Sequence, residues 1–336
     1  MRRLTSLVIL LLAGCLFWGA GRVGVNMRNQ RPGGFERPEN APPMLALTTV
    51  ALGGFRGLIA DLLWLRATRL QDEGRFVELV QLADWIAKLD PASPQIWGYH
   101  AWNMAFNVSA MMSVPSEAWR WIESAIHLLR DEGLRYNPHD ARLCFELGWI
   151  YMFKIGGTTD ERHLYYKQQL ADDVERILEN GMLGPEYTSP PDLADRLHTE
   201  LDMGIAAMRF LDERYGRLDW RLPESHAVYW ARQGMFSKDD PVLLDRITCQ
   251  CLSALFFTGK LTYDPGSSAY RREPAYHLLP GVMLAYETAL DRSTGERVQI
   301  AFRAFIEAAI REFERTGKTE EIELLTARLD ALPVGE

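Results

Sequence analysis

The stretch from Leu218 to Arg232, LDWRLPESHAVYWAR, holds the densest group of side chains that could carry out chemistry. Five polar functional groups fall within eleven residues: Asp219, Arg221, Glu224, His226 and Tyr229. A histidine beside carboxylates can act as a general acid or base, and an arginine can bind an anion. The same residues could instead form a buried turn, in which the arginine and the acids satisfy one another and nearby carbonyls. Because no nucleophile is defined, the buried turn is favoured and the polar site is kept as the alternative.

Other signatures of catalysis or metal binding are missing from the sequence. It contains no glycine-rich phosphate loop, no GxSxG and no HExxH. The seven histidines form no pair three or four residues apart, and the four cysteines include no CxxC pair. We therefore expect a protein that is not an enzyme and that uses neither a cofactor nor a metal.

The charge of the chain is unevenly distributed. Its 336 residues carry 37 basic and 45 acidic side chains, a net charge of -8. Residues 1–44 have six arginines and two glutamates, a local charge of +4, which leaves -12 on the remainder. An acidic body repels phosphate backbones, so nucleic acid is excluded as a general partner. With 47% hydrophobic residues, the chain has enough apolar surface for one or two packed domains.

The first 21 residues have the layout of an export signal. Arg2 and Arg3 precede 18 uncharged residues, 4–21, which as a helix would reach about 27 Å and nearly cross a hydrocarbon core. This length predicts an uncleaved anchor in a bacterial inner membrane, with the body in the periplasm. Two alternatives remain, a cleaved signal peptide and a lipoprotein, since residues 12–15 (LAGC) resemble a lipobox that would be acylated at Cys15. Residues 22–44, rich in Pro, Gly, Asn and Arg, predict a flexible linker.

Two prolines mark an internal repeat. Pro91 and Pro138 each close an amphipathic helix, and placing Pro91 near the end of a 34-residue unit sets the phase of the pattern. The units then start at Ala60, Pro94 and Ala141. The segments WLRATRLQDEGRFVELVQLADWIAKLDP and LCFELGWIY resemble the tetratricopeptide repeat (TPR). In that repeat the small residue at position 8, here Gly148 in the third unit, lets two helices approach closely, and several units must stack to bury their apolar faces.

The resemblance implies a peptide-binding surface on the concave face formed by the first helix of each unit. The positions that face a ligand in such proteins carry Asp61, Trp64, Gln71, Trp102, Arg142, Phe145 and Trp149. Large aromatic side chains are frequent interface anchors, and Arg142 could bind an acidic group of a partner. The alternative is that flanking helices at 54–65 and 192–215 cover this face and make its residues part of the core.

The remainder of the chain predicts further helices. Apolar residues recur with a helical period over 192–215, 241–259 and 295–317, and a degenerate repeat could occupy 302–333. No strand is expected, and 260–274 is expected to be irregular. The predicted fold is therefore all-α, with irregular TPR-like hairpins forming an α-α superhelix over 45–180 and a helical region over 181–336.

The predicted function follows from these elements. A membrane-tethered helical-repeat domain without catalytic signatures is expected to be an adaptor or scaffold that binds a protein partner in an envelope assembly. The alternative is an envelope enzyme or small-ligand-binding protein that uses the polar site at 218–232. The sequence does not indicate which protein the partner is.

Overall fold

The computed structural model describes residues 56–184, 190–237, 242–264, 269–292 and 296–332. The chain divides into two compact units, Met1–Ile96 and Trp97–Glu336. The described residues are mostly helical, which confirms the all-α prediction at the level of fold class. The predicted signal segment and linker, 1–44, lie outside the described residues. Within the described ranges, no helix has both the length and the apolar content needed to cross a membrane.

The described part of the first unit is a helical hairpin. α3 (Arg56–Asp72) packs on α4 (Phe76–Leu89). Gly74 follows α3 with a φ of 70°, and the N–H of Arg75 donates to the carbonyl of Leu70 at 2.9 Å. Glycine reverses the chain here without the strain that a Cβ would add to a left-handed residue.

Three of the following helices contain a π-helical turn, in which backbone hydrogen bonds span five residues instead of four. The three continuous helices are α5 (Pro94–Trp102) with the π turn Asn103–Val108 and α6 (Ser109–Met111), α7 (Pro115–His127) with Leu128–Gly133 and α8 (Leu134–Tyr136), and α9 (Ala141–Trp149) with Ile150–Ile155. In the last of them the Gly156 N–H donates to the Tyr151 carbonyl at 2.9 Å. Each π turn adds one residue to its helix and changes the direction in which the later side chains point.

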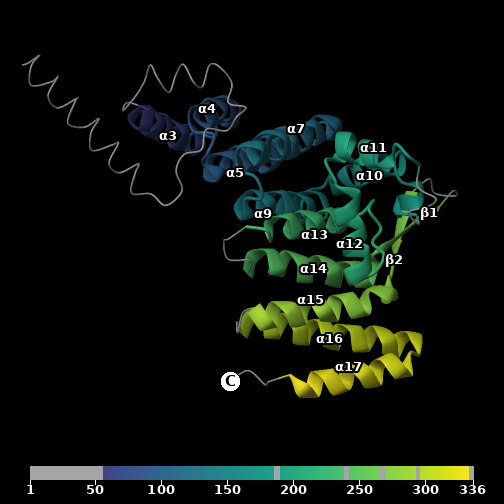
Figure 1. Cartoon of the computed structure of the whole chain (residues 1–336). Helices are drawn as coiled ribbons and strands as arrows, with labels where there is room; N and C mark the ends of the chain where they lie inside the picture. Colours follow the sequence, from purple (N-terminus) through teal and green to yellow (C-terminus); the bar gives the residue numbers. More distant parts are fainter. Residues whose placement is uncertain (1–55, 185–189, 238–241, 265–268, 293–295, 333–336) are drawn as a thin grey trace, which may run out of the picture. The chain divides into compact units, whose positions relative to one another are not determined.

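Figure 1 shows α9 and five later helices as successive layers of the second unit. These are α13 (Pro223–Gly234), α14 (Val242–Thr258), α15 (Leu279–Arg292), α16 (Glu296–Thr316) and α17 (Thr319–Ala331). α9 packs directly on α13. Gly234 permits this approach, because an added Cβ there would lie 2.8 Å from Cβ of Cys144; an added Cβ on Gly148 would instead be closest to Cδ1 of Ile247 on α14, at 3.1 Å. A regular repeat would pair α9 with the next helix along the chain, whereas here three helices separate α9 from its partner.

Those three intervening helices are α10 (His163–Glu175), α11 (Leu193–Leu201) and α12 (Ile205–Tyr215). The prediction of one helix over 192–215 is wrong, because the chain breaks between α11 and α12. Asp202 has a left-handed backbone with a φ of 51°, and the N–H of Gly204 donates to the Tyr229 hydroxyl at 2.8 Å. The hydroxyl gives this backbone group a partner outside the helix, which stabilises the break.

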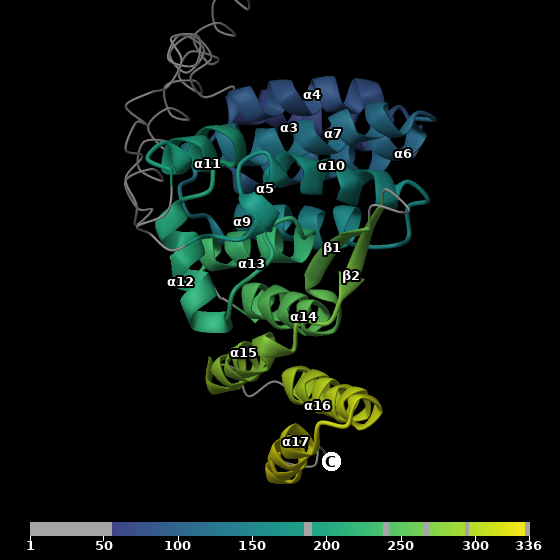
Figure 2. The same ribbon diagram turned by 90° about the vertical axis from the view of Figure 1, so that its right-hand side faces the viewer.

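A two-stranded antiparallel sheet occupies the segment that was expected to be irregular, so the prediction of no strands is also wrong. β1 (Lys260–Asp264) pairs with β2 (Ala269–Glu273), and the hairpin lies beside α14 (Figure 2). Leu261 ties β1 to the core: its N–H donates to Asp219 at 3.0 Å, and its carbonyl accepts from Arg221 at 2.7 Å. These bonds link residues about forty positions apart, and no local periodicity signals them.

Candidate functional site

A groove lined by aromatic side chains lies between two of the helices that carry π turns. Trp102 and Phe106 come from α5 and the turn after it, and Trp149 and Phe153 come from α9 and the turn after it. With the segment 159–162 they border a cavity of about 820 Å³, which we call the aromatic groove. Trp102 is 39% exposed and Phe153 is 45% exposed. Adjoining exposed aromatic side chains of this size are typical of a binding surface.

The π turn aligns the rings along one wall of the groove. In an α-helix a step of four residues overshoots one turn by about 40°, whereas in a π-helix of about 4.4 residues per turn it falls short by a similar angle. Phe145, Trp149 and Phe153 are four residues apart, with the first step in α9 and the second in the π turn, so the two deviations offset each other. The ring centroids of Phe145 and Trp149 are 5.8 Å apart, and those of Trp149 and Phe153 are 4.7 Å apart with planes inclined by only 6°. The result is a continuous stacked row.

The polar residues of the groove form a closed charge cluster. Asp160 accepts from Lys154 at 2.8 Å and from Arg162 at 3.0 Å. Burial alone would raise the pKa of Asp160, but the hydrogen bonds from Lys154 and Arg162 outweigh it and hold that pKa well below its ordinary value. Arg162 also donates to the carbonyls of Ser109 and Met112. Glu161 also lines the cavity, so two cationic side chains face two carboxylates there, and the groove offers a ligand little net charge.

The structure brings together part of the predicted peptide-binding surface. Trp102 and Trp149 line the aromatic groove, and Phe145 stacks on Trp149. Arg142 is exposed on α9 but does not line the cavity. The other three predicted residues are on α3 in the first unit: Asp61, Trp64 and Gln71. The side chain of Asp61 lies outside the described residues.

Two aromatic residues of the groove, Phe106 and Phe153, were not predicted. Each lies four residues after a predicted tryptophan, and this spacing is the signal that could have found them. The alternative prediction had helices at 54–65 and 192–215 covering the surface. Among the described residues that border the cavity, none comes from 192–215.

The predicted polar site lies in a stretch, 218–231, that is buried throughout. Asp219 accepts from Nε and Nη2 of Arg221 at 2.9 and 2.8 Å. Arg221 also donates to Glu175 at 2.9 Å and to the Leu261 carbonyl. Asp219 and Arg221 border a cavity of about 740 Å³ beside the β-hairpin, but their hydrogen-bonding groups are already engaged with each other and with the protein.

The other three predicted polar residues face different partners. Nε2 of His226 lies 2.8 Å from the carbonyl of Trp220. Burial lowers the pKa of His226 to about 4, so the ring is neutral at pH 7 and donates this bond. Glu224 pairs with Arg272 at 2.9 Å, and Tyr229 accepts the backbone bond described above. All three side chains are buried within α13, so none is a free acid or base facing solvent.

Asp212, which leads into the buried turn, gives a prediction for pH dependence. Its carboxylate accepts from the N–H of Leu218 at 3.1 Å, yet burial dominates and raises its pKa from 3.8 to about 6. A carboxyl group with a raised pKa contributes stability that is fully present below pH 3.8 and is lost as pH rises through about 6. Asp212→Asn keeps an acceptor for Leu218 and should stabilise the protein by about 2 kcal/mol above pH 7, with little effect near pH 4. Urea unfolding across this pH range tests it, with the exposed neighbour Glu213→Gln as control; parallel pH profiles for Asp212→Asn and the unmodified chain would contradict it.

These observations define the class of protein: in its described parts, an all-α chain that presents an open aromatic groove and buries the polar side chains predicted as a site at 218–232. No group of three or more His, Cys, Asp or Glu side chains in those parts is arranged to hold a metal. Comparison of the chain with protein-family models, curated proteins and solved structures finds no match.

Proposed function

We propose that this chain is a non-catalytic adaptor that binds a segment of a partner protein in the aromatic groove. The observation that carries the proposal is the stacked row Phe145, Trp149 and Phe153, of which Trp149 and Phe153 line one open cavity together with Trp102 and Phe106. Rigid aromatic side chains give a large contact area at a low cost in conformational entropy, and they dominate the binding energy of many interfaces.

The chemistry of the groove selects an apolar partner segment. The walls are aromatic, and the cluster of Lys154, Arg162 and Asp160 is internally paired. A ligand that relied on charge would have to break these bonds. A segment that presents one or two apolar side chains would cover the exposed rings and leave the cluster intact.

The architecture that we propose is an irregular, TPR-like α-α superhelix. The layered helices of the second unit support it (Figure 1). The proposed tether is the segment 1–21, as an uncleaved anchor or as a lipoprotein acylated at Cys15, with the body in the periplasm. Arg2, Arg3 and the uncharged run that follows support this placement.

The alternative, an envelope enzyme or ligand-binding protein that uses 218–232, has one supporting observation, the cavity beside Asp219 and Arg221. The bidentate pairing of these two residues opposes it. A ligand there would have to displace bonds that also anchor β1 through Leu261.

Replacement of the groove tryptophans tests the proposal. Trp102→Ala and Trp149→Ala should each weaken partner binding by about 30-fold or more, because each removes an anchor. The full-length chain is used to capture partners from solubilised membranes, and the affinity of each candidate is then measured with both variants. A captured protein counts as the partner when it binds the purified, unmodified chain directly, and both variants should then lose it.

The matched control is Trp85→Ala, which removes a 61% exposed tryptophan from α4 in the first unit. It should retain full binding. If a folded double variant lacking Trp102 and Trp149 bound the partner as tightly as the unmodified chain, the groove would not be the binding site. Circular dichroism of each variant establishes that it is folded.

A further inference from the structure

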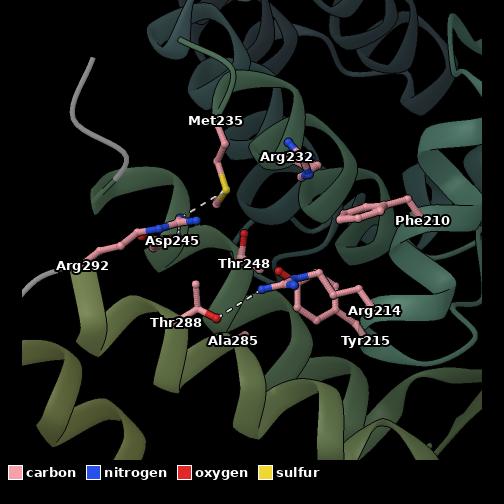
Figure 3. Close-up of a pocket in the computed structure, with 10 residues that line it drawn as sticks. All are labelled: Phe210, Arg214, Tyr215, Arg232, Met235, Asp245, Thr248, Ala285, Thr288 and Arg292. Atoms are coloured by element: carbon pink, nitrogen blue, oxygen red, sulfur yellow. Dashed lines mark hydrogen bonds and ion pairs between the residues drawn. The ribbon is translucent and has the colours of Figure 1, made fainter. Parts of the chain in front are cut away.

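A second cavity, of about 230 Å³, lies among α12, α13, α14 and α15 in the second unit. Three arginines reach it from three different helices: Arg214 from α12, Arg232 from α13 and Arg292 from α15. Figure 3 shows Arg214 and Arg292 extending toward one another from opposite sides, with Thr248 and Thr288 between them. Residues far apart in the sequence therefore place three guanidinium groups around one space.

The positive charge of this cavity is only partly neutralised. Arg292 donates to Asp245 at 2.8 Å. Arg214 donates to the hydroxyl of Thr288 at 3.3 Å, and within the described residues neither Arg214 nor Arg232 has a carboxylate at ion-pair distance. The body of the chain carries a net charge of -12, so the scarcity of acids here runs against the overall composition.

Arg232 is held in place by its flat faces. Its guanidinium lies 4.9 Å from the ring centroid of Phe210 and 4.3 Å from that of Phe236. Burial, followed by repulsion from Arg214 and Arg292, lowers its pKa from the ordinary value. These cation–π contacts do not use the N–H groups as hydrogen-bond donors, so within the described residues those groups remain available to a ligand.

The two threonine hydroxyls that line the cavity cannot donate hydrogen bonds to a ligand. Thr248 donates to the Leu244 carbonyl at 2.9 Å, and Thr288 donates to the Leu284 carbonyl at 2.7 Å. Neither hydroxyl has a proton left to donate. The donors that remain are guanidinium N–H groups, which suit the oxygens of phosphate and carboxylate.

We propose that this cavity is a binding site for a phosphate-type oxyanion, either free phosphate or a small phosphate monoester. A dianion would neutralise two arginines at once. The volume is below the roughly 300–1,000 Å³ of sites for drug-sized ligands, which excludes a nucleotide. This assignment is independent of the aromatic groove and of the partner that the groove binds.

Phosphate titration of the full-length chain, at constant ionic strength maintained with sodium chloride, tests the site. About 20 mM inorganic phosphate should raise the melting temperature by several degrees relative to chloride. Arg214→Gln and Arg232→Gln should each weaken phosphate binding by about tenfold or more, measured by calorimetry. Arg246→Gln, which removes an exposed arginine from α14 and leaves the cavity intact, should respond like the unmodified chain.

A second readout separates a ligand site from a structural stack. Without phosphate, Arg232→Gln should melt at or above the temperature of the unmodified chain, because it relieves repulsion among the arginines. A lower melting temperature with an intact phosphate response would assign Arg232 to packing alone and overturn the proposal. If chloride raised the melting temperature as much as phosphate does, the proposal of an oxyanion site would be overturned. If succinate, a dicarboxylate, raised it as much as phosphate does, the assignment of the ligand as phosphate would be overturned. If Arg232→Gln does not fold, the test rests on Arg214→Gln, and unchanged phosphate binding by that variant would overturn the proposal.

Discussion

Replacing Asp219 with alanine is expected to lower the free energy of unfolding of the second unit by about 3–5 kcal/mol. Asp219 is 1% exposed and accepts from the Nε, Nη2 and backbone N–H groups of Arg221 and from the backbone N–H of Leu261. Its removal leaves the buried guanidinium of Arg221 without its main counter-ion and detaches β1 from the turn. Urea unfolding at pH 7 measures the loss.

The control for Asp219 is an exposed ion pair in the same region. Lys260 and Glu273 are 3.1 Å apart across the hairpin and about half exposed, so Glu273→Ala should cost less than about 1 kcal/mol. A double variant that lacks both Arg221 and Asp219 should lose less free energy of unfolding than the two single variants lose in sum. In the double variant neither buried charge is left without its partner. If Asp219→Ala and Glu273→Ala had similar effects, the buried cluster would not be a main source of stability.

Gly281→Ala is expected to cost about 3 kcal/mol or more, or to prevent folding of the second unit. Gly281 lies near the start of α15, where an added Cβ would be 2.0 Å from the carbonyl oxygen of Tyr215 at the end of α12. That obstacle is backbone and cannot rotate away. In an unobstructed helix the same change would be favourable by about 1 kcal/mol, so the sign of the effect reports the contact between the two helices.

Gly98→Ala is the matched control for Gly281. Gly98 is also inside a helix, and the nearest atom to an added Cβ is Cγ of Glu146 at 3.3 Å, on a flexible side chain that can move. Its stability should be unchanged or slightly increased. Thermal and urea unfolding of both variants provide the comparison, and a fully stable Gly281→Ala protein would show that α12 and α15 do not meet as described.

The sequence was most informative where structure is local. Helical periodicity and the position of Pro91 predicted helical hairpins, and α3 and α4 form one. The break at Asp202 was missed because it depends on a hydroxyl from Tyr229, on a different helix. The β-hairpin was missed for a similar reason, since Leu261 is held by bonds from a turn about forty residues earlier.

The candidate sites likewise depend on features that the local sequence pattern does not reveal. Trp102 and Trp149 could be selected from their repeat positions, but the row of stacked rings that includes Phe153 requires a π turn, which apolar periodicity does not reveal. The arginine cavity could not be predicted at all. Its three arginines, at 214, 232 and 292, lie on separate helices, and only the packing of those helices brings them together.

The π turns also determine which kinds of sequence change the aromatic groove can tolerate. Deleting one residue between Trp149 and Phe153 would restore ordinary α-helical hydrogen bonding, and the three-residue step that remains, about 300°, differs by only about 30° from four residues of π-helix. Phe153 should therefore stay close to the row. A deletion between Phe145 and Trp149, in the α-helical part of α9, would instead rotate the later rings by about 100°, so the groove should tolerate the loss of a residue in the π turn better than one in the α-helix before it.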